Sequence, residues 1–268
     1  MSGNSMRQYG GRSVWVHLPA GYDPDRAAPY PLLILHDGQN LSASRPEAWG
    51  GSWRADDAVD RLILDGRIPP IVLAGIDHAG DERLTEFDAP SRLRWRSRPA
   101  RRYAMLVRDE IVPGLARDFR VDISRDGLGL GGSSMGALAA LWMASLDPGR
   151  YGRLLVMSPS VWWRQRAVLR TLRRHPLDPA TRVWVHAGLH EGDAVLSDAR
   201  ALRDMLRGSG TRTIRYVEDE AGHHTEATWA RQLPEAIEWL YGKPGPAAAD
   251  RTTLDEHHDA ATLTSGTP

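Results

Sequence analysis

The sequence predicts an α/β fold built on a mainly parallel, doubly wound sheet with helices on both faces. Short apolar runs alternate with helical patterns along most of the 268 residues, which is typical of parallel strands linked by helices. Two of the runs, 32–36 and 71–76, are apolar almost without a break, as expected for central strands covered on both faces. The length suits one α/β domain of ordinary size, and 41% apolar residues are enough to build its core.

The elements can be placed along the chain from these patterns. We expect strands at 13–18, 32–36, 71–76, 127–130, 154–157, 183–186 and 213–217, the first of which alternates like an exposed or edge strand. Helical patterns fall between them, at 54–65, 101–117, 135–146, 164–173, 194–207 and 226–241. Residues 1–10 are predicted to be a flexible N-terminus, 11–242 the folded domain, and 243–268 a disordered polar tail.

Composition narrows the classes of function. The 34 basic residues balance 34 acidic ones, so nothing indicates binding to nucleic acid or to an acidic membrane surface. The lack of cysteine excludes disulfides, a thiolate nucleophile and Cys-ligated metals. No stretch reaches the roughly 18 apolar residues of a membrane span, and residues 1–9 lack the apolar core of a signal peptide. We therefore expect a cytoplasmic protein that binds neither membrane nor nucleic acid.

The most informative motif is the pentapeptide Gly132-Ser133-Ser134-Met135-Gly136, a G-x-S-x-G sequence. It follows the apolar run at 127–130 and precedes a strong helix-forming segment at 135–146. A serine on a tight strand-to-helix turn exposes its hydroxyl as a nucleophile, and small neighbours let the strand and helix approach each other. The motif therefore predicts acyl transfer with Ser134 as the nucleophile.

A nucleophilic serine needs a base, usually histidine, and an acid that orients it. Two loops that follow later strands supply candidates, and they come after Ser134 in the chain. We predict His224 as the base because Thr225 and the following residues open a helix that would anchor it, with His223 as the alternative. Glu191 is the predicted acid, one tight turn beyond its strand, and Asp193 is its rival.

The negatively charged oxygen of the tetrahedral intermediate needs two backbone N–H donors. One is expected from Met135, the residue after the nucleophile, and the other from Gln39, where Gly38 permits a sharp turn after the strand at 32–36. Asp37 precedes Ser134 in the chain, so a role in bracing the loop is favoured over catalysis. This chemistry requires no metal and no organic cofactor.

Four motifs, taken together, resemble the Putative esterase family. They are Leu35-His36-Asp37-Gly38-Gln39-Asn40, Gly131-Gly132-Ser133-Ser134-Met135-Gly136, Ser158-Pro159-Ser160-Val161-Trp162-Trp163 and His224-Thr225-Glu226-Ala227-Thr228-Trp229. The family has the α/β-hydrolase fold and includes enterochelin esterases, esterase D, feruloyl and acetyl-xylan esterases, and mycolyltransferases. The resemblance covers about residues 12–241 and is strongest to the enterochelin branch. It implies the same catalytic residues: Ser134, His224 and Glu191, with Gln39 and Met135 as backbone donors.

Substrate contacts are predicted from the aromatic and arginine residues near these loops. Trp53, Trp162 and Trp163, together with Trp49, are candidates for an aromatic wall, and Arg83 begins an arginine-rich segment, 83–102, that can rise over the site. The prediction is a serine esterase acting on a small-molecule ester, with a catecholate-siderophore or other aromatic ester as the favoured substrate. The alternatives are a carbohydrate acetyl or feruloyl esterase, an acyltransferase, and a non-catalytic binding module.

Overall fold

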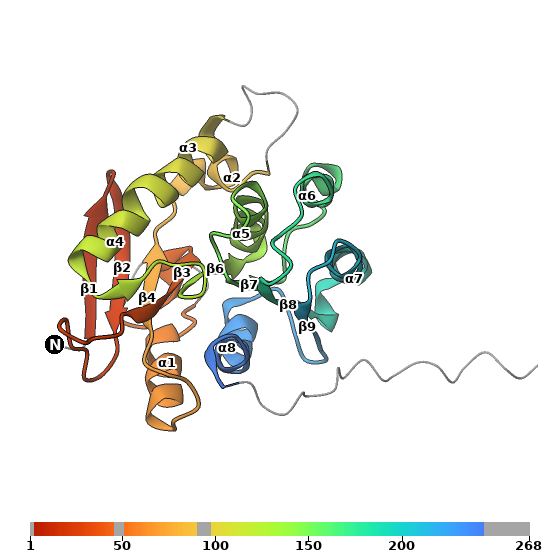
Figure 1. The fold of residues 1–268 in the computed structure, drawn as a ribbon. Helices are drawn as coiled ribbons and strands as arrows, with labels where there is room; N and C mark the ends of the chain where they lie inside the picture. Colours follow the sequence, from red (N-terminus) through yellow and green to blue (C-terminus); the bar gives the residue numbers. More distant parts are fainter. Residues whose placement is uncertain (1–2, 46–50, 90–97, 244–268) are drawn as a thin grey trace, which may run out of the picture.

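The computed structural model describes residues 3–45, 51–89 and 98–243, and it has the predicted α/β architecture (Figure 1). One sheet runs in the order β1-β2-β4-β3-β6-β7-β8-β9, with β5 paired to β3. β1 and β2 run antiparallel to their neighbours, and all other pairs are parallel. The strands are β1 (Gly3–Tyr9), β2 (Arg12–Leu18), β3 (Tyr30–His36), β4 (Val72–Ile76), β5 (Val121–Asp122), β6 (Leu128–Ser133), β7 (Arg153–Met157), β8 (Arg182–Gly188) and β9 (Thr213–Asp219).

Helices cover both faces of this sheet, as the sequence predicts. They are α1 (Ala55–Leu64), α2 (Arg83–Glu86), α3 (Arg98–Leu106), α4 (Val112–Asp118), α5 (Ser134–Leu146), α6 (Trp163–Arg174), α7 (Asp193–Gly208) and α8 (Glu226–Tyr241). A π-helical turn, Val107–Ile111, joins α3 to α4, so the helix expected at 101–117 is one continuous helical stretch with an irregular centre. Short 3₁₀ turns lie at Gly38–Asn40, Gly80–Glu82 and Leu189–Glu191.

Side chains that alternate along the strands build two cores, one on each face of the sheet. Leu32 and Ile34 of β3 point to the face covered by α3, α4, α5, α6 and α7, whereas Leu33 and Leu35 point to the face covered by α1 and α8. Figure 1 shows these two layers, with α1 and α8 together on one side. Because both faces of the central strands are buried, those strands must be apolar without interruption, which is the pattern that predicted them.

The N-terminus differs from the prediction. Residues 3–9 form a strand, β1, which pairs along its whole length with β2 and occupies the edge of the sheet. As a result the strand predicted at 13–18 lies inside the sheet, where Val14 and Val16 are fully buried. The turn between the strands is Gly10-Gly11, with φ of 53° and 76°. A glycine pair with positive φ is a strong hairpin signal, and it was the sign of β1 in the sequence.

The predicted tail, 243–268, lies outside the described residues except for Lys243. None of the described helices is both long and apolar enough to cross a membrane. The parallel strands all end at the same edge of the sheet, the edge where ligands bind in open α/β sheets. Ser134, Glu191 and His224 each follow one of these strands.

Candidate active site

Ser134 lies where β6 passes into α5, in the strained backbone of a nucleophile elbow. Its φ is 52°, in the left-handed region that side chains other than glycine rarely adopt. The two glycines of the motif permit the tight packing of this turn. A Cβ on Gly132 would lie 3.0 Å from the carbonyl carbon of Gly136, and a Cβ on Gly136 would lie 3.1 Å from the Cβ of His36. The spacing G-x-S-x-G is therefore required by contacts on both sides of the serine.

The structure brings Ser134, His224 and Glu191 together in one hydrogen-bonded relay. His224 Nε2 lies 2.9 Å from Ser134 Oγ, and His224 Nδ1 lies 2.7 Å from Glu191 Oε2. With its proton on Nδ1, the imidazole donates to Glu191 and leaves Nε2 to accept from the serine hydroxyl. Thr225 caps α8 by accepting a hydrogen bond from the Thr228 N–H, which anchors the loop that carries His224.

The two rival residues lie elsewhere. The ring of His223 stacks on that of His190, with centroids 4.7 Å apart, and no contact in the described structure joins it to Ser134. Gly192, with φ of 96°, separates Glu191 from Asp193, which is the first residue of α7. No hydrogen bond between Asp193 and a histidine occurs among the described residues. The geometry therefore favours the predicted pair over both alternatives.

Glu191 is held by donors from three parts of the chain. Its side chain is completely excluded from solvent, and Oε1 accepts hydrogen bonds from Ser158 Oγ at 2.6 Å and from the Gly188 N–H at 2.7 Å. Ser158 in turn accepts a hydrogen bond from Trp229 Nε1 at 2.9 Å. Burial raises the pKa of Glu191, but the hydrogen bonds from His224, Ser158 and Gly188 outweigh it, and the net pKa lies below the ordinary value of 4.5. Glu191 is therefore ionised when it faces His224.

Two serines of this site received no role from the sequence. Ser158 is fully buried and has a left-handed backbone with φ of 45°. Ser160 Oγ lies 3.1 Å from Ser134 Oγ, and the Ser160 N–H donates to the Ser134 carbonyl. Both belong to the Ser-Pro-Ser-x-Trp-Trp segment after β7. The segment was identified as a motif, but only the structure shows that its serines contact the nucleophile and the acid.

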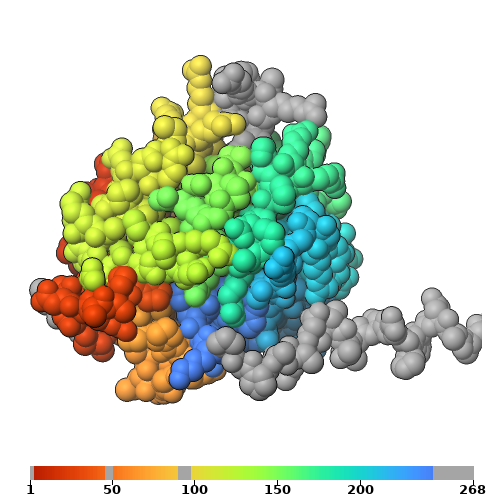
Figure 2. Space-filling model, viewed as in Figure 1, coloured from red at the N-terminus to blue at the C-terminus, as the bar shows by residue number. Residues whose placement is uncertain are grey.

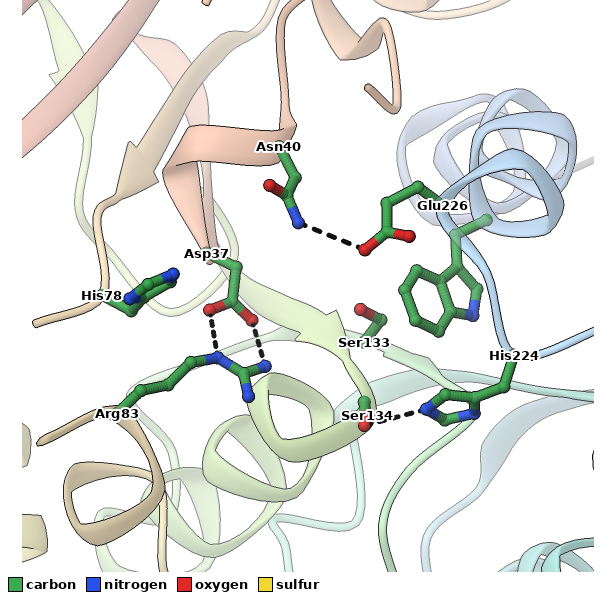
Figure 3. A pocket seen from close by; sticks show the side chains of 9 residues that line it. Asp37, Asn40, His78, Arg83, Ser133, Ser134, His224 and Glu226 are labelled. Atoms are coloured by element: carbon green, nitrogen blue, oxygen red, sulfur yellow. Dashed lines mark hydrogen bonds and ion pairs between the residues drawn. The ribbon is translucent and has the colours of Figure 1, made fainter. Parts of the chain in front are cut away.

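A cavity of about 290 Å³ opens beside Ser134 (Figure 3). Its lining residues come from the loops after β3, β4 and β6 and from the start of α8: Asp37, Asn40, His78, Arg83, Ser133, Ser134, His224, Glu226 and Trp229. Arg83 forms a two-point ion pair with Asp37, with Nε–Oδ1 at 2.6 Å and a second bond at 2.8 Å. The predicted substrate contact Arg83 thus reaches the cavity, and Asp37 has the bracing role that was favoured for it.

The turn that carries Gln39 is fixed by close backbone packing. Gly38 lies against β4, where a Cβ on Gly38 would come within 2.5 Å of the Gly75 carbonyl oxygen. The Gln39 side chain bonds to both backbone groups of His78, donating to its carbonyl at 3.2 Å and accepting from its N–H at 3.1 Å. These contacts hold the turn beside the elbow. That the N–H groups of Gln39 and Met135 bind the oxyanion stays a prediction.

The tryptophans are arranged differently from the prediction. Trp53 packs in the core against Trp229, with ring centroids 5.9 Å apart, and it is not among the residues that line the cavity. Trp162 is 52% exposed, and Trp163 donates from Nε1 to Asp88; neither lines the cavity. Trp229, which no substrate role was predicted for, forms the aromatic surface instead. Trp49 and part of the arginine-rich segment, 90–97, lie outside the described residues.

The other histidines and the acidic residues form no metal centre in the part of the chain that the structure describes. His36 is buried, with Nδ1 2.7 Å from the Tyr103 hydroxyl, and burial lowers its pKa to about 4. His186 is fully buried between β7 and β9, and burial lowers its pKa as well. Both side chains are therefore neutral structural groups near neutral pH.

A strained serine after a central parallel strand, hydrogen-bonded to a histidine that follows the last strand, is the arrangement typical of serine hydrolases with the α/β-hydrolase fold. The comparison with known families agrees: the chain belongs to the family described as "Putative esterase", whose model matches residues 5–240. The resemblance seen in the four sequence motifs is thereby confirmed at the level of the family, and the predicted fold class is confirmed with it.

Individual relatives are distant. The chain is 26% identical over 257 residues to an iron(III) enterobactin esterase of Dickeya dadantii, covering 90% of this chain and 54% of that protein. It is 30% identical over 258 residues to an iron(III) salmochelin esterase of Escherichia coli, covering 89% of this chain and 57% of the relative. Among solved structures, the BES protein from Bacillus cereus superposes with a TM-score of 0.72 at 17% identity, over 90% of this chain and 95% of the other. The chain thus spans about half the length of these two siderophore esterases.

Proposed function

We propose that this chain is a serine esterase that cleaves carboxylic esters through a covalent acyl-enzyme on Ser134. The observation that supports it best is the continuous relay from Ser134 Oγ through His224 to Glu191, with heavy-atom distances of 2.9 Å and 2.7 Å. These distances lie in the range that proton transfer requires. Membership of an esterase family supports the same reaction. The Glu191 side chain is excluded from solvent and hydrogen-bonded to the imidazole, which is not expected of a solvated loop carboxylate.

Each residue of the site has a defined role in the proposed mechanism. His224 accepts the hydroxyl proton through Nε2 while Ser134 Oγ attacks the ester carbonyl carbon. Glu191 holds the ring in the productive tautomer and stabilises the imidazolium. The N–H groups of Gln39 and Met135 bind the oxyanion. His224 then protonates the leaving alkoxide and deprotonates the water that releases the acid, so both half-reactions use one base.

For the substrate we propose an aromatic or catecholate-siderophore ester, handled in the cytoplasm. The two relatives named as iron(III) enterobactin and salmochelin esterases support this class, and the Trp229 ring offers an apolar surface beside the nucleophile. Transfer of the acyl group to an alcohol would use the same relay. It differs only in whether water or a second hydroxyl enters the cavity.

Hydrolysis of a small ester panel tests this function. The panel contains p-nitrophenyl acetate and butyrate, methyl ferulate, and enterobactin with and without iron(III), each measured with Ser134→Ala as the control. We expect turnover that disappears in the variant, and the ranking of substrates identifies the branch of the family. Turnover that survives in Ser134→Ala, or no turnover of any ester, would contradict the proposal.

A further inference from the structure

Glu226 lines the cavity but takes no part in the relay. It is the first residue of α8, two positions after His224, and Figure 3 shows its carboxylate directed toward Asn40 at the cavity wall. Among the described residues, the side chain that donates to it is Asn40, whose Nδ2 lies 3.3 Å from Oε1, and its own backbone N–H is a second donor. This long contact with a neutral amide leaves acceptor capacity on the carboxylate, since an ionised carboxylate can accept about four hydrogen bonds.

The other charged groups around the cavity are already paired. Arg83 is committed to Asp37 through two short hydrogen bonds. His224 is bonded to Glu191. Glu226 is thus the carboxylate of the cavity lining that no described cation pairs with. Burial is the main reason that its pKa is raised above 4.5, and the charge of Asp37 adds to the increase, whereas its own backbone N–H, His224 and Arg83 oppose it. A partly buried carboxylate in this condition gains more than an exposed one from a donor or cation that a ligand brings.

We propose that Glu226 is a specificity-determining residue of this site, which selects esters carrying an ammonium or hydroxyl group and disfavours esters carrying an anion. The inference rests on the proposed esterase function and narrows its substrate: among catechol esters it favours the iron-free form, whose protonated hydroxyl groups can donate, over an anionic catecholate. The ligand's donor would take the open acceptor positions of the Glu226 carboxylate, next to the Asn40 contact. An ester with a carboxylate at the same position would meet an unpaired negative charge.

The test uses two ester series in which one substituent changes and the shape is nearly constant. One series is methyl benzoates and the other is benzyl acetates, so that the substituent lies on the acyl part or on the alcohol part. The 4-substituents are aminomethyl, hydroxymethyl, ethyl and carboxymethyl. kcat/KM is measured for the wild-type protein and for Glu226→Gln, which keeps the size and the Asn40 contact but removes the charge.

Glu235→Gln is the matched control. Glu235 lies on the same helix but is half-exposed and paired with Arg215, away from the cavity. We expect the wild-type ratio of aminomethyl to ethyl ester to fall about tenfold in Glu226→Gln in at least one series, equivalent to about 1.4 kcal/mol. The carboxymethyl ester should improve, the ethyl ester should stay within a few-fold, and Glu235→Gln should change none of the ratios.

If Glu226 had only a structural role, Glu226→Gln would change kcat/KM by the same factor for all four substituents. Unchanged ratios in both series, or an equal change throughout, would overturn the inference and leave the esterase intact. No hydrolysis that depends on Ser134 would overturn the proposed function and the inference together. These outcomes are separated by the Ser134→Ala control.

Discussion

Two carboxylates lie on either side of the His224 loop, and their surroundings are opposite. Glu191 is excluded from solvent, and donors from Ser158, Gly188 and His224 hold its pKa below 4.5. Glu226 is partly buried, accepts a long hydrogen bond from the Asn40 side chain and one from its own backbone N–H, and has its pKa raised. A carboxylate whose acceptor positions are filled by the protein can only orient its neighbour. One with open positions remains able to bind a ligand.

The comparison depends first on which histidine connects Glu191 to the nucleophile. We expect His224→Ala to lower kcat by about 10⁴-fold or more, because the relay then has no base. His223→Ala should keep most of the activity, since the His223 ring stacks on His190 and makes none of the hydrogen bonds of the relay. Steady-state kinetics on p-nitrophenyl butyrate measure both variants. Comparable loss in His223→Ala, with His224→Ala active, would reverse the assignment of the base.

Substitution of Glu191 should cause the next largest loss of kcat, and substitution of Glu226 should cause little. Glu191→Gln should lower kcat by about 10³-fold, because a neutral amide cannot stabilise the imidazolium and favours the wrong tautomer. Glu226→Gln should change kcat for a neutral ester by less than about threefold. The two variants are measured on the same uncharged substrate. A large loss of kcat in Glu226→Gln would mean that the two carboxylates do not have separate roles.

Removing one donor sharpens the account of Glu191. Ser158→Ala deletes the hydroxyl that donates to Oε1 at 2.6 Å, which should raise the Glu191 pKa and lower the free energy of unfolding more at pH 7 than at pH 4. The kcat at neutral pH should fall about tenfold. Trp229→Phe removes only the donor to Ser158 and should produce a smaller change in the same direction. An equal loss of stability at pH 7 and pH 4 in Ser158→Ala would show that this bond does not set the ionisation of Glu191.

The pH dependence of the free energy of unfolding should differ in sign between the two carboxylates, and this is the smallest of the expected effects. The lowered pKa of Glu191 contributes stability that is present above pH 4.5 and is lost as the pH falls through the folded-state pKa. The raised pKa of Glu226 has the opposite effect, because the charged form is disfavoured in the folded state and stability is lost as the pH rises above 4.5.

At pH 7, therefore, Glu191→Gln should lower the free energy of unfolding and Glu226→Gln should raise it, each by on the order of 1 kcal/mol. Urea denaturation at pH 7 and at pH 4 measures both differences, which should shrink at the lower pH. Equal signs for the two variants at pH 7 would contradict the contrast between the sites.

The sequence was sufficient for the features that depend on local pattern and chain order. Uninterrupted apolar runs predicted β3 and β4, and the order of the loops after Ser134 led to Glu191 and His224. The choice of His224 over His223 followed from the helix start that Thr225 caps. Each of these features can be read from a short stretch of sequence, and folding brings the residues concerned together.

Side-chain direction and long-range packing could not be predicted from local sequence patterns. Trp53 and Trp229 are both buried tryptophans that pack against each other, and only the position of α8 against α1 decides that Trp229 is the one lining the cavity. Ser158 acquires its role from three contacts, with β8, α8 and the turn after β8. The β1 strand was overlooked because its side chains are polar, although its Gly10-Gly11 turn is a recognisable hairpin signal.

Labelling with a fluorophosphonate probe, read by intact-protein and peptide mass spectrometry, tests whether Ser134 is an activated nucleophile. The probe reacts with a serine only when a neighbouring base activates the hydroxyl. A working relay predicts one phosphonate adduct on the peptide that contains Ser134, absent in Ser134→Ala, strongly slowed in His224→Ala, and retained in Glu226→Gln. An unlabelled wild-type protein, or an adduct that persists in Ser134→Ala, would contradict it.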